Sequence, residues 1–364
     1  MTTGALEAGL AQGHGGERRG GMPAGLDGEA AAVSVIVCAY TERRWEQTVA
    51  ALRSVLGQRP APAQALLVVD HNPELAARAR ACWPAGDRPG VTVLESDEPP
   101  GLSGARNCGL RHATQPVAAF LDDDACARPG WLAALTAPYA DEAVVATGGG
   151  VHPVWPGRRP SWLPPTFDWV VGCSYLGLPE SVGEVRNPIG ANMSMRTELA
   201  RRAGGFDGSV GRVGTRPRGC EETELAIRLT AGRAGAVVLH VPRAEVDHHV
   251  SADRVRPGYY LRRCWHEGVS KAEVVRLAGA RDGLGRERRH VAAVLPAAMA
   301  NDLRGLARGD LAGAARFAAA VAGLGSAACG YLGRRARLLL ARRDRGAGPA
   351  ALAALEPAAW VHAE

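Results

Sequence analysis

Four short apolar runs recur along the first third of the chain. Each consists mainly of valine, leucine, isoleucine or alanine and is bounded by polar or turn-forming residues, which is typical of strands buried in a parallel sheet. Between the first two runs, Trp45, Val49, Leu52 and Leu56 recur at helical spacing. Strands that alternate with helices predict an α/β fold with a doubly wound, mostly parallel sheet flanked by helices. The predicted strands cover residues 33–38, 66–69, 91–94 and 117–121.

Local signals mark the ends of the intervening helices. Thr41 is placed to cap the helix after the first strand, and Ser103 to cap a helix that runs to about His112. Pro73 suits the first turn of a helix that ends at Cys82. Because the strands are predicted to be parallel, the polar residues after them should meet at one edge of the sheet, where ligands bind in open α/β sheets.

The middle of the chain is less regular. Residues 151–187 are rich in proline, tryptophan and glycine and predict a long, partly irregular insertion of the kind that shapes substrate sites. Its Trp155, Trp162 and Trp169 suit either sugar rings or core packing. Regular structure then resumes, with strands predicted at residues 191–196 and 236–241 and helices at 197–203, 221–231 and 257–277.

The region from about residue 286 onward is helical sequence rich in alanine, leucine and arginine. Its residues 317–332 carry no charge, but this run is shorter than the roughly 20 residues that span a bilayer. Arg316, Arg334 and Arg335 flank the run. The pattern predicts a buried or interfacial helix, and the basic flanks allow peripheral attachment to a membrane.

Composition narrows the classes of function. The 364 residues carry a net charge of +6, and nearly all of the basic residues are arginine, with Lys271 the only lysine. This basicity is diffuse and aromatic residues are few, so we expect no nucleic-acid partner. The eight cysteines form no CxxC pair, which favours reduced thiols in the cytoplasm over disulfides or a zinc site. Residues 1–31 predict a disordered tail rather than a signal peptide.

Three consecutive acids, Asp122, Asp123 and Asp124, follow the fourth predicted strand. Their mutual repulsion favours a bound cation, and carboxylate oxygens suit magnesium or manganese that carries a diphosphate. A solvated acidic loop is the alternative explanation. Farther along the chain, His248 and His249 are neighbours. Because adjacent side chains of a strand point to opposite faces, at most one of these histidines faces such a cleft.

Other charged residues begin predicted helices or follow predicted strands. The charges of Glu221 and Glu222 suit the N-terminus of a helix, which is one explanation for this pair. The other is that one of the two carboxylates serves as a general base. Asp70 follows the second strand and either caps the next helix or accepts hydrogen bonds from a base or a ribose. Residues 101–107 begin a further helix, whose backbone N–H groups suit a phosphate together with Arg106.

Taken together, these segments resemble the family-2 glycosyltransferases of the GT-A fold. The resemblance spans about residues 33–232, and residues 248–272 further resemble bacterial, particularly actinobacterial, members. Each segment is modest alone, whereas their order and spacing together are specific. The matching segments are VSVIVCAYTE, ALRSVLGQ, LLVVD, GLSGARNCGL, FLDDDACARPGWL, GANMSMRTELARRAGGFD and GCEETELAIRL.

The resemblance implies a domain organisation and a donor site. Residues 32–280 would form the GT-A domain, in which 32–124 bind the nucleotide and 125–280 the acceptor, and residues 281–364 would form a helical C-terminal extension. The expected donor is a nucleotide sugar. The donor-binding residues that the resemblance implies are Ala39, Tyr40, Glu42, Asp70, Arg106 and Asp123.

A metal site is also implied. Asp122 and Asp124 match the outer acids of the family's DxD motif, with Asp124 as the direct ligand of Mn²⁺ or Mg²⁺. His248 would complete the metal site, as a late histidine does in some GT-A enzymes.

The resemblance implies that Glu221 and Glu222 contain the general base of the reaction. Glu222 matches the second acid of the family's Glu-Asp pair, which serves as the general base, and Glu221 is the second choice. Asn192 and Asp207 would border the acceptor, which is a saccharide, a glycolipid or a natural product. The implied reaction is an inverting single displacement at the sugar's anomeric carbon. The expected location is the cytoplasm or the inner face of the cell membrane.

Two other functions compete with this interpretation. A nucleotidyltransferase that builds nucleotide sugars usually carries a glycine-rich loop after its first strand, and residues 38–46 lack glycine. A non-catalytic nucleotide- or carbohydrate-binding protein need not keep its acids, whereas this chain keeps both acidic clusters. Where the family often continues Asp-Gly-Ser, Asp70 is followed by His71 and Asn72, so the pocket beyond Asp70 should differ from the family's.

Overall fold

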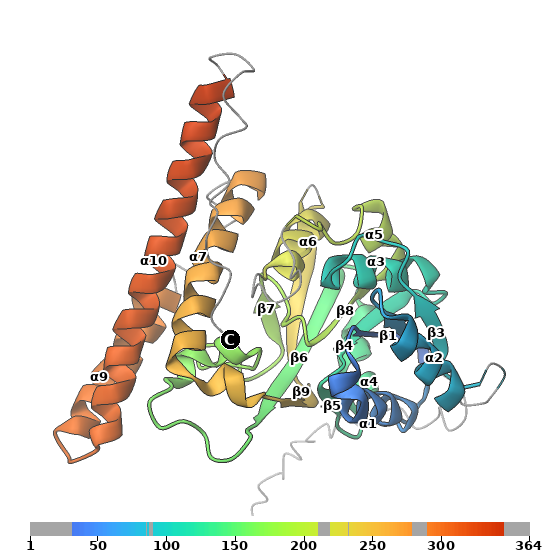
Figure 1. The fold of residues 1–364 in the computed structure, drawn as a ribbon, viewed down its shortest axis with the longest axis horizontal. Coiled ribbons are helices and arrows are strands. Elements are labelled where there is room, and N and C mark those ends of the chain that lie inside the picture. Colours follow the sequence, from blue (N-terminus) through green and yellow to red (C-terminus); the bar gives the residue numbers. More distant parts are fainter. Residues whose placement is uncertain are drawn as a thin grey trace, which may run out of the picture.

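The computed structural model describes residues 31–84, 86, 90–209, 219–231, 233–278 and 290–345. Within these ranges, one large sheet is flanked by helices, and the C-terminal helices stand beside it (Figure 1). This arrangement confirms the predicted α/β class with a helical C-terminal region. The predicted N-terminal tail lies outside the described residues, except for Ala31.

The first half of the sheet is parallel, as predicted. Its strands lie in the order β3-β2-β1-β4, and each neighbouring pair is parallel. Helices cross over between these strands, and the second helix has the predicted bounds. The elements are β1 (Ala31–Ala39), α1 (Trp45–Leu56), β2 (Pro62–Val69), α2 (Pro73–Cys82), β3 (Thr92–Glu95), α3 (Leu102–His112) and β4 (Val117–Asp122).

The second half of the sheet is mixed. β8 is antiparallel to both β4 and β6, β9 is parallel to β6, and β5 and β7 are both antiparallel to β9. The parallel prediction therefore holds only as far as β4. Three strands of this half, β5, β6 and β7, were not predicted from the sequence, and β9 is longer than the predicted strand at residues 236–241. The bounds are β5 (Ala125–Ala127), β6 (Val144–Val154), β7 (Gly183–Val185), β8 (Asn192–Arg196) and β9 (Val237–His249).

Short helices connect these strands. Ser103 was expected to cap α3, but Gly101 is the capping residue and Ser103 lies inside the helix, where its hydroxyl donates to the Asp207 carbonyl at 3.3 Å. The remaining elements of this part are η1 (Glu42–Arg44), α4 (Trp131–Thr136), η2 (Ala137–Ala140), η3 (Pro165–Val171), α5 (Thr197–Arg202), α6 (Glu221–Thr230) and η4 (Ala252–Val255).

The core explains why β1 is apolar on both faces. Val35 and Val37 belong to the apolar cluster that includes α1 and α2, whereas Ile36 between them belongs to the cluster that includes α3. All three side chains are fully buried. Because each face of the strand is covered by helices, β1 reads as a continuous apolar run rather than as an alternating pattern.

The C-terminal helices pack through close backbone contact. A Cβ atom on Gly268 would lie 1.9 Å from the Ala327 carbonyl oxygen, and one on Gly330 would lie 2.2 Å from that of Trp265. Glycine is therefore required where α10 crosses α7. The Tyr260 hydroxyl also donates to the Ala319 carbonyl at 2.8 Å. These elements are α7 (Pro257–Ala278), η5 (His290–Val294), α9 (Leu295–Leu306) and α10 (Leu311–Arg345).

Helix α10 is longer than the uncharged run that the sequence suggested. In the part of the chain that the structure describes, its residues Leu311–Leu340 form the one helix that is long and apolar enough to cross a membrane by length and composition. Only 17% of its most apolar window is buried. Length and composition alone do not distinguish a membrane span from a surface helix.

Candidate active site

The sheet brings the predicted metal ligands together. β4 ends at Asp122, and the short strand β5 that follows pairs with the end of β9, so that Ala125 lies opposite His248. The backbone N–H of His249 donates to the Asp124 carbonyl at 2.8 Å. The acidic triplet is thus fixed against the last residues of β9, more than a hundred residues away in sequence.

Asp122, Asp124 and His248 form one cluster, in which one ligand atom of each residue lies within 4.8 Å of the others. His248 Nε2 lies 3.2 Å from Asp124 Oδ1, and both side chains are buried. His249 is partly exposed. As expected for a strand, only one of the two neighbouring histidines joins the acids.

The rear of the His248 ring is closely packed. Cys173 Sγ lies 3.6 Å from His248 Nδ1, so Nε2 is the nitrogen that faces the acids. A Cβ atom on Gly172 would lie 3.3 Å from the ring's Cε1, and Gly172 has a φ of +86°, which L side chains rarely adopt. The end of η3 therefore holds the imidazole in place.

The donor set of this cluster fits a divalent transition metal. Carboxylate oxygens bind both magnesium and manganese, whereas an imidazole nitrogen is a poorer ligand for magnesium, which prefers an all-oxygen shell. Two carboxylates and one imidazole therefore fit Mn²⁺ better than Mg²⁺.

The negative charges of Asp123 and Asp124 are only partly neutralised. Arg44 Nη1 lies 2.8 Å from Asp123 Oδ1 and 3.0 Å from Asp124 Oδ2, and Arg254 Nη2 lies 4.0 Å from Asp124 Oδ2. Asp123 Oδ2 is buried without a hydrogen-bond partner. Such an arrangement favours an additional cation.

The pKa values of the two buried acids diverge. Burial, followed by the charge of Asp124, raises the pKa of Asp123 to about 7. Burial alone would also raise the pKa of Asp124, but His248 and Arg44 beside it hold that pKa well below its usual range. Asp124 therefore stays ionised, as a metal ligand must.

Arg106 connects the two acidic clusters. Its Nη2 lies 3.3 Å from Asp122 Oδ1 and donates to the Gly190 carbonyl at 3.0 Å, while its Nη1 lies 3.1 Å from Glu221 Oε1. The residue is 2% exposed. The structure holds the guanidinium between Asp122 and Glu221, at the lining of a cavity, and the expected contact of Arg106 with a phosphate stays a prediction.

Helix α6 begins with the second acidic pair. Glu221 is buried against Arg106 and Glu222 is half-buried, and both residues line a cavity. Burial, with the charge of Glu221 as the next contribution, raises the pKa of Glu222 from 4.5 to about 7. A carboxyl group with a pKa in this range suits proton exchange near neutral pH.

The predicted donor-binding residues gather at the ends of β1 and β2. Asp70 Oδ2 accepts from the Gly101 N–H at 2.9 Å, and its Oδ1 lies 2.8 Å from His71 Nδ1. Asp70 therefore links the end of β2 to the start of α3. Its carboxylate already has two partners, one of which comes from the His71 that departs from the family's pattern.

The remaining predicted donor residues surround the end of β1. Ala39 is buried, whereas Tyr40 is 53% exposed and Glu42 is exposed. The Arg44 guanidinium lies 5.7 Å from the centroid of the Tyr40 ring. An exposed aromatic face beside the acidic triplet is a suitable surface for a flat nucleobase.

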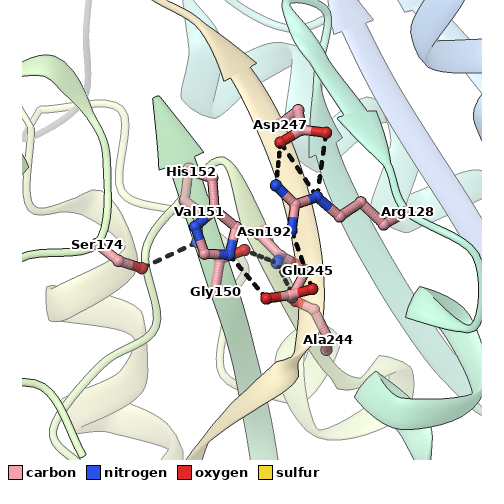
Figure 2. Close-up of polar contacts among 9 residues, drawn as sticks. All are labelled: Arg128, Gly150, Val151, His152, Ser174, Asn192, Ala244, Glu245 and Asp247. Atoms are coloured by element: carbon pink, nitrogen blue, oxygen red, sulfur yellow. Dashed lines mark hydrogen bonds and ion pairs between the residues drawn. The ribbon is translucent and has the colours of Figure 1, made fainter. Parts of the chain in front are cut away.

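Asn192, which was expected to border the acceptor, lies inside the sheet and is not part of the described cavity lining. It is fully buried, and its Nδ2 donates to the carbonyls of Gly150 at 3.0 Å and Ala244 at 2.7 Å, while its Oδ1 accepts from Trp131 Nε1 at 2.8 Å. Figure 2 shows the amide between the strands that carry these carbonyls. Its amide joins β8 to β6 and β9, which is a structural role.

Asp207 also lies away from the cavity lining. Its Oδ1 accepts from the Ser209 N–H at 2.8 Å, and its carbonyl accepts from Ser103. The turn thus helps to fix the position of α3, and the expected contact of Asp207 with an acceptor stays a prediction.

A surface ion-pair network braces β9 behind the site (Figure 2). Arg128 Nη2 lies 2.6 Å from Asp247 Oδ1, and its Nη1 lies 3.1 Å from Glu245 Oε2. His152 Nε2 lies 2.9 Å from Glu245 Oε1. These contacts tie β6 and β9 to the residue that follows β5, and so stabilise the strand that carries His248.

A cavity of about 1170 Å³ opens from the two acidic clusters. Asp122, His248 and Glu222 lie along one part of it, and the C-terminal helices form the opposite wall. The sequence did not indicate that these helices reach the site. Trp169, which the sequence offered as a surface for a sugar ring, lies in this wall, and the wall residues that were not anticipated include Arg254, Arg263, Glu267, Leu324, Ala327 and Tyr331.

Comparisons with known proteins agree with this geometry. The family model of glycosyl transferase family 2 matches residues 34–204. A glucosyl-dolichyl phosphate glucuronosyltransferase of Haloferax volcanii is 35% identical over 240 residues, which cover 66% of this chain and 76% of the relative. The succinoglycan biosynthesis protein ExoM of Rhizobium meliloti is 25% identical over 245 residues, which cover 67% of this chain and 75% of the relative.

A solved structure shows the same fold. The mannosyltransferase PcManGT from Pyrobaculum calidifontis superposes with a TM-score of 0.52 and 19% identity, over 84% of this chain and 88% of that chain. The fold and the arrangement of acids therefore define a glycosyltransferase of the GT-A fold. The chain belongs to glycosyl transferase family 2. It is an enzyme that transfers sugars.

Proposed function

We propose that this enzyme transfers a sugar from a nucleotide diphosphate sugar to a hydroxyl group of a lipid-linked saccharide, with inversion at the anomeric carbon and with Mn²⁺ as cofactor. One observation carries the proposal: the cluster of Asp122, Asp124 and His248 shares one cavity with a carboxylate, Glu222, whose pKa is raised to about 7. A metal-binding cluster suits the diphosphate of the donor, and the carboxylate suits the acceptor hydroxyl.

The relatives support the choice of donor and acceptor. The name of the Haloferax relative gives a glucosyl-dolichyl phosphate as what it glycosylates. The Pyrobaculum neighbour, which shares the fold, was solved with GDP-Man and Mn²⁺. In the present chain, an apolar wall from α10 borders the cavity, which suits a lipid-linked acceptor better than a free sugar.

The proposal assigns a separate role to each group of residues in the site. Asp122, Asp124 and His248 hold the metal, which when bound supplies positive charge to the leaving diphosphate. Glu222 accepts the proton of the acceptor hydroxyl as that oxygen attacks the anomeric carbon. Glu221 and Arg106 fix the start of α6 and therefore the position of Glu222.

The proposed location follows from α10. Its side chains Val321, Leu332, Leu339 and Leu340 are each at least half exposed, and arginines stand among them and beyond them. An exposed apolar helix with basic residues binds anionic membrane surfaces. We therefore place the enzyme at the cytoplasmic face of the membrane, with its acceptor's lipid beside α10.

The proposal is tested by calorimetric titration with UDP, GDP and dTDP, each with and without MnCl₂. We expect one nucleotide to bind in a manganese-dependent way, and Asp124→Asn to abolish that dependence. Asp247→Asn is the matched control, because Asp247 lies on the adjacent strand in a surface ion pair with Arg128. If the wild-type protein binds none of the nucleotides under either condition, the proposal is wrong.

A further inference from the structure

Helix α7 holds the segment that precedes the proposed base. Cys220, two residues before Glu222, is buried and has a φ of +77°, a conformation that L side chains rarely adopt. Its Sγ donates to Glu267 Oε1 of α7 at 3.4 Å. A Cβ atom on Gly219 would lie 3.0 Å from Arg263 Nη2, so the backbone of this segment also lies against α7. The start of α6 therefore takes its unusual conformation in contact with two charged side chains of one helix.

The partner that Cys220 meets on α7 is a fixed carboxylate. Arg263 Nη1 lies 2.8 Å from Glu267 Oε2, and Lys271 Nζ lies 3.3 Å from Glu267 Oε1. Although burial raises the pKa of Glu267, Lys271 and Arg263 hold it at about 2. Burial, followed by the charge of Glu267, raises the pKa of the Cys220 thiol well above its usual value. The contact therefore joins a protonated thiol to an ionised carboxylate, which is a charge-assisted hydrogen bond.

Apolar packing keeps α6 and α7 in register beyond this contact. Cys220, Ile227 and Val274 form one buried apolar cluster, in which the first two residues come from α6 and its cap and the third from α7. Ile227 lies about two turns along α6 from Cys220. The carboxylate of Glu267 is thus presented to the start of α6 by a helix that packs along α6.

Glu267 also acts on Glu222 through its charge. Both residues line the cavity. Burial and then the charge of Glu221 contribute most to the raised pKa of Glu222, Glu267 raises it further, and Arg106 lowers it. The described titratable groups around Glu222 thus come from three helices: Glu221 and Cys220 at the start of α6, Arg106 on α3, and Glu267 with its partners Arg263 and Lys271 on α7.

We infer that Glu267 is a positioning residue of the reaction, which holds the start of α6 through Cys220 and thereby aims Glu222 at the acceptor hydroxyl. It acts through another residue and by its charge, without touching the reacting atoms. Helix α7 lies beyond residues 34–204, which the family model matches, so a later part of the chain sets the direction of the base. This inference deepens the proposed function and rests on Glu222 being the base.

Two substitutions separate the charge of Glu267 from its reach. Glu267→Gln keeps an oxygen that accepts from Cys220 but removes the charge, whereas Glu267→Asp keeps the charge and is one methylene shorter. Glu273→Gln is the matched control on α7. Glu273 also pairs with two cations, Arg276 Nε at 2.7 Å and Arg334, but it is not among the described residues that line the cavity.

The first measurement is the titration of Glu222, followed by ¹³C NMR of the glutamate carboxyl carbons and assigned by its loss in Glu222→Gln. In Glu267→Gln the pKa of Glu222 should fall by roughly half a unit or more, because a negative charge nearby is removed. In Glu273→Gln it should stay within about 0.2 unit of the wild-type value. A residue that only stabilised the fold would not move this pKa.

The second measurement is amide hydrogen exchange at the start of α6. The Glu224 N–H donates to the Cys220 carbonyl at 2.9 Å and so reports on the first turn of the helix. In Glu267→Asp and Cys220→Ala its exchange should be about tenfold faster, because the contact between thiol and carboxylate is lost. Both variants should also lower kcat and leave the affinity for nucleotide with MnCl₂ unchanged. Glu273→Gln should exchange at the wild-type rate.

Several results would overturn the inference. Wild-type exchange at Glu224 in both Glu267→Asp and Cys220→Ala would do so, as would an unchanged pKa of Glu222 in Glu267→Gln. A loss of nucleotide binding in Glu267→Gln would assign this residue to the donor site instead. If the α7 variants unfold, Cys220→Ala decides, because it removes the same contact from the side of α6. By contrast, turnover of Glu222→Gln at the wild-type rate would contradict the proposed base itself, so the two failures are distinguishable.

Discussion

Arg106 and Glu221 form a buried ion pair, with Arg106 Nη1 3.1 Å from Glu221 Oε1, and the same guanidinium lies 3.3 Å from Asp122. Helix α3 therefore joins the carboxylate that ends β4 to the first residue of α6. The acids of the candidate metal cluster and the proposed base Glu222 come from segments about a hundred residues apart. Their relative position depends on this one side chain.

Replacing Arg106 should therefore harm both stability and catalysis. Arg106→Met would leave Glu221 buried without its partner, at a cost of about 3–5 kcal/mol in the free energy of unfolding. Arg106→Lys should retain part of the stability but not the contacts to two acids and a carbonyl. Denaturant unfolding and steady-state kinetics check this, with Arg128→Lys at the surface ion pair as the control. Wild-type stability in Arg106→Met would contradict the bridging role.

Glu222→Gln should abolish turnover while leaving metal-dependent nucleotide binding intact. The amide keeps the shape of the side chain but does not accept the proton, so kcat should fall by about 10²–10⁴-fold. Glu221→Gln should instead lower the melting temperature, because its charge balances Arg106. Turnover of Glu222→Gln at the wild-type rate would rule out this residue as the base.

The pH dependence of turnover should reflect Glu222. The base acts in its ionised form, and its pKa is raised from 4.5 to about 7. The rate should therefore rise with pH and level off above about 7, falling about tenfold per unit below it. The free energy of unfolding should change in the opposite direction. Because the pKa of Glu222 is raised in the folded protein, its contribution to stability is fully present below pH 4.5 and is lost as pH rises through about 7. A flat profile of kcat/KM between pH 5.5 and 8 would count against Glu222 as the general base.

His248→Asp should change the metal preference. An all-oxygen set suits magnesium better than the wild-type set with one imidazole, so the ratio of activity with MnCl₂ to activity with MgCl₂ should fall about tenfold. His249→Asp is the control, because that neighbouring side chain does not belong to the cluster. An unchanged ratio in His248→Asp would remove the histidine from the metal site.

Asn192→Ala should destabilise the protein without a selective effect on substrate binding. The change leaves Trp131 Nε1 and the carbonyls of Gly150 and Ala244 without their present partner, which costs about 3 kcal/mol or more. The melting temperature should fall by roughly 5–10 °C. Calorimetric melting checks the shift. A large rise in acceptor KM with an unchanged melting temperature would restore Asn192 to the acceptor site.

The parallel half of the fold was predictable because its signals are local. A buried parallel strand is apolar throughout, and a helix such as α2 carries its proline and its end signals within ten residues. Asp122, Asp124 and His248 were also predicted, and they lie together. The antiparallel half was harder to predict from the sequence, because β6 contains three consecutive glycines, Gly148, Gly149 and Gly150, which weaken the strand pattern.

The residues that sequence reasoning missed depend on long-range packing. Arg44 and Arg254 reach Asp124 from opposite ends of the domain's sequence. Arg263, Glu267 and Lys271 do carry a local signal, the spacing of four residues on one helix face, but that pattern usually marks a solvated ion-pair ladder. Only the position of α10 against α7 makes their face the wall of a cavity.

Close contact at Gly268 and Gly330 holds α10 against α7, where α10 borders the cavity. The matched family region ends at residue 204, whereas α10, which forms part of the apolar wall of the cavity, lies beyond it. Under the proposed function, exchange of the last helices should change which acceptor the enzyme takes and should leave the donated sugar the same. A chimera that keeps Gly268 in α7 and Gly330 in α10, and replaces the other residues of α10, would test this separation.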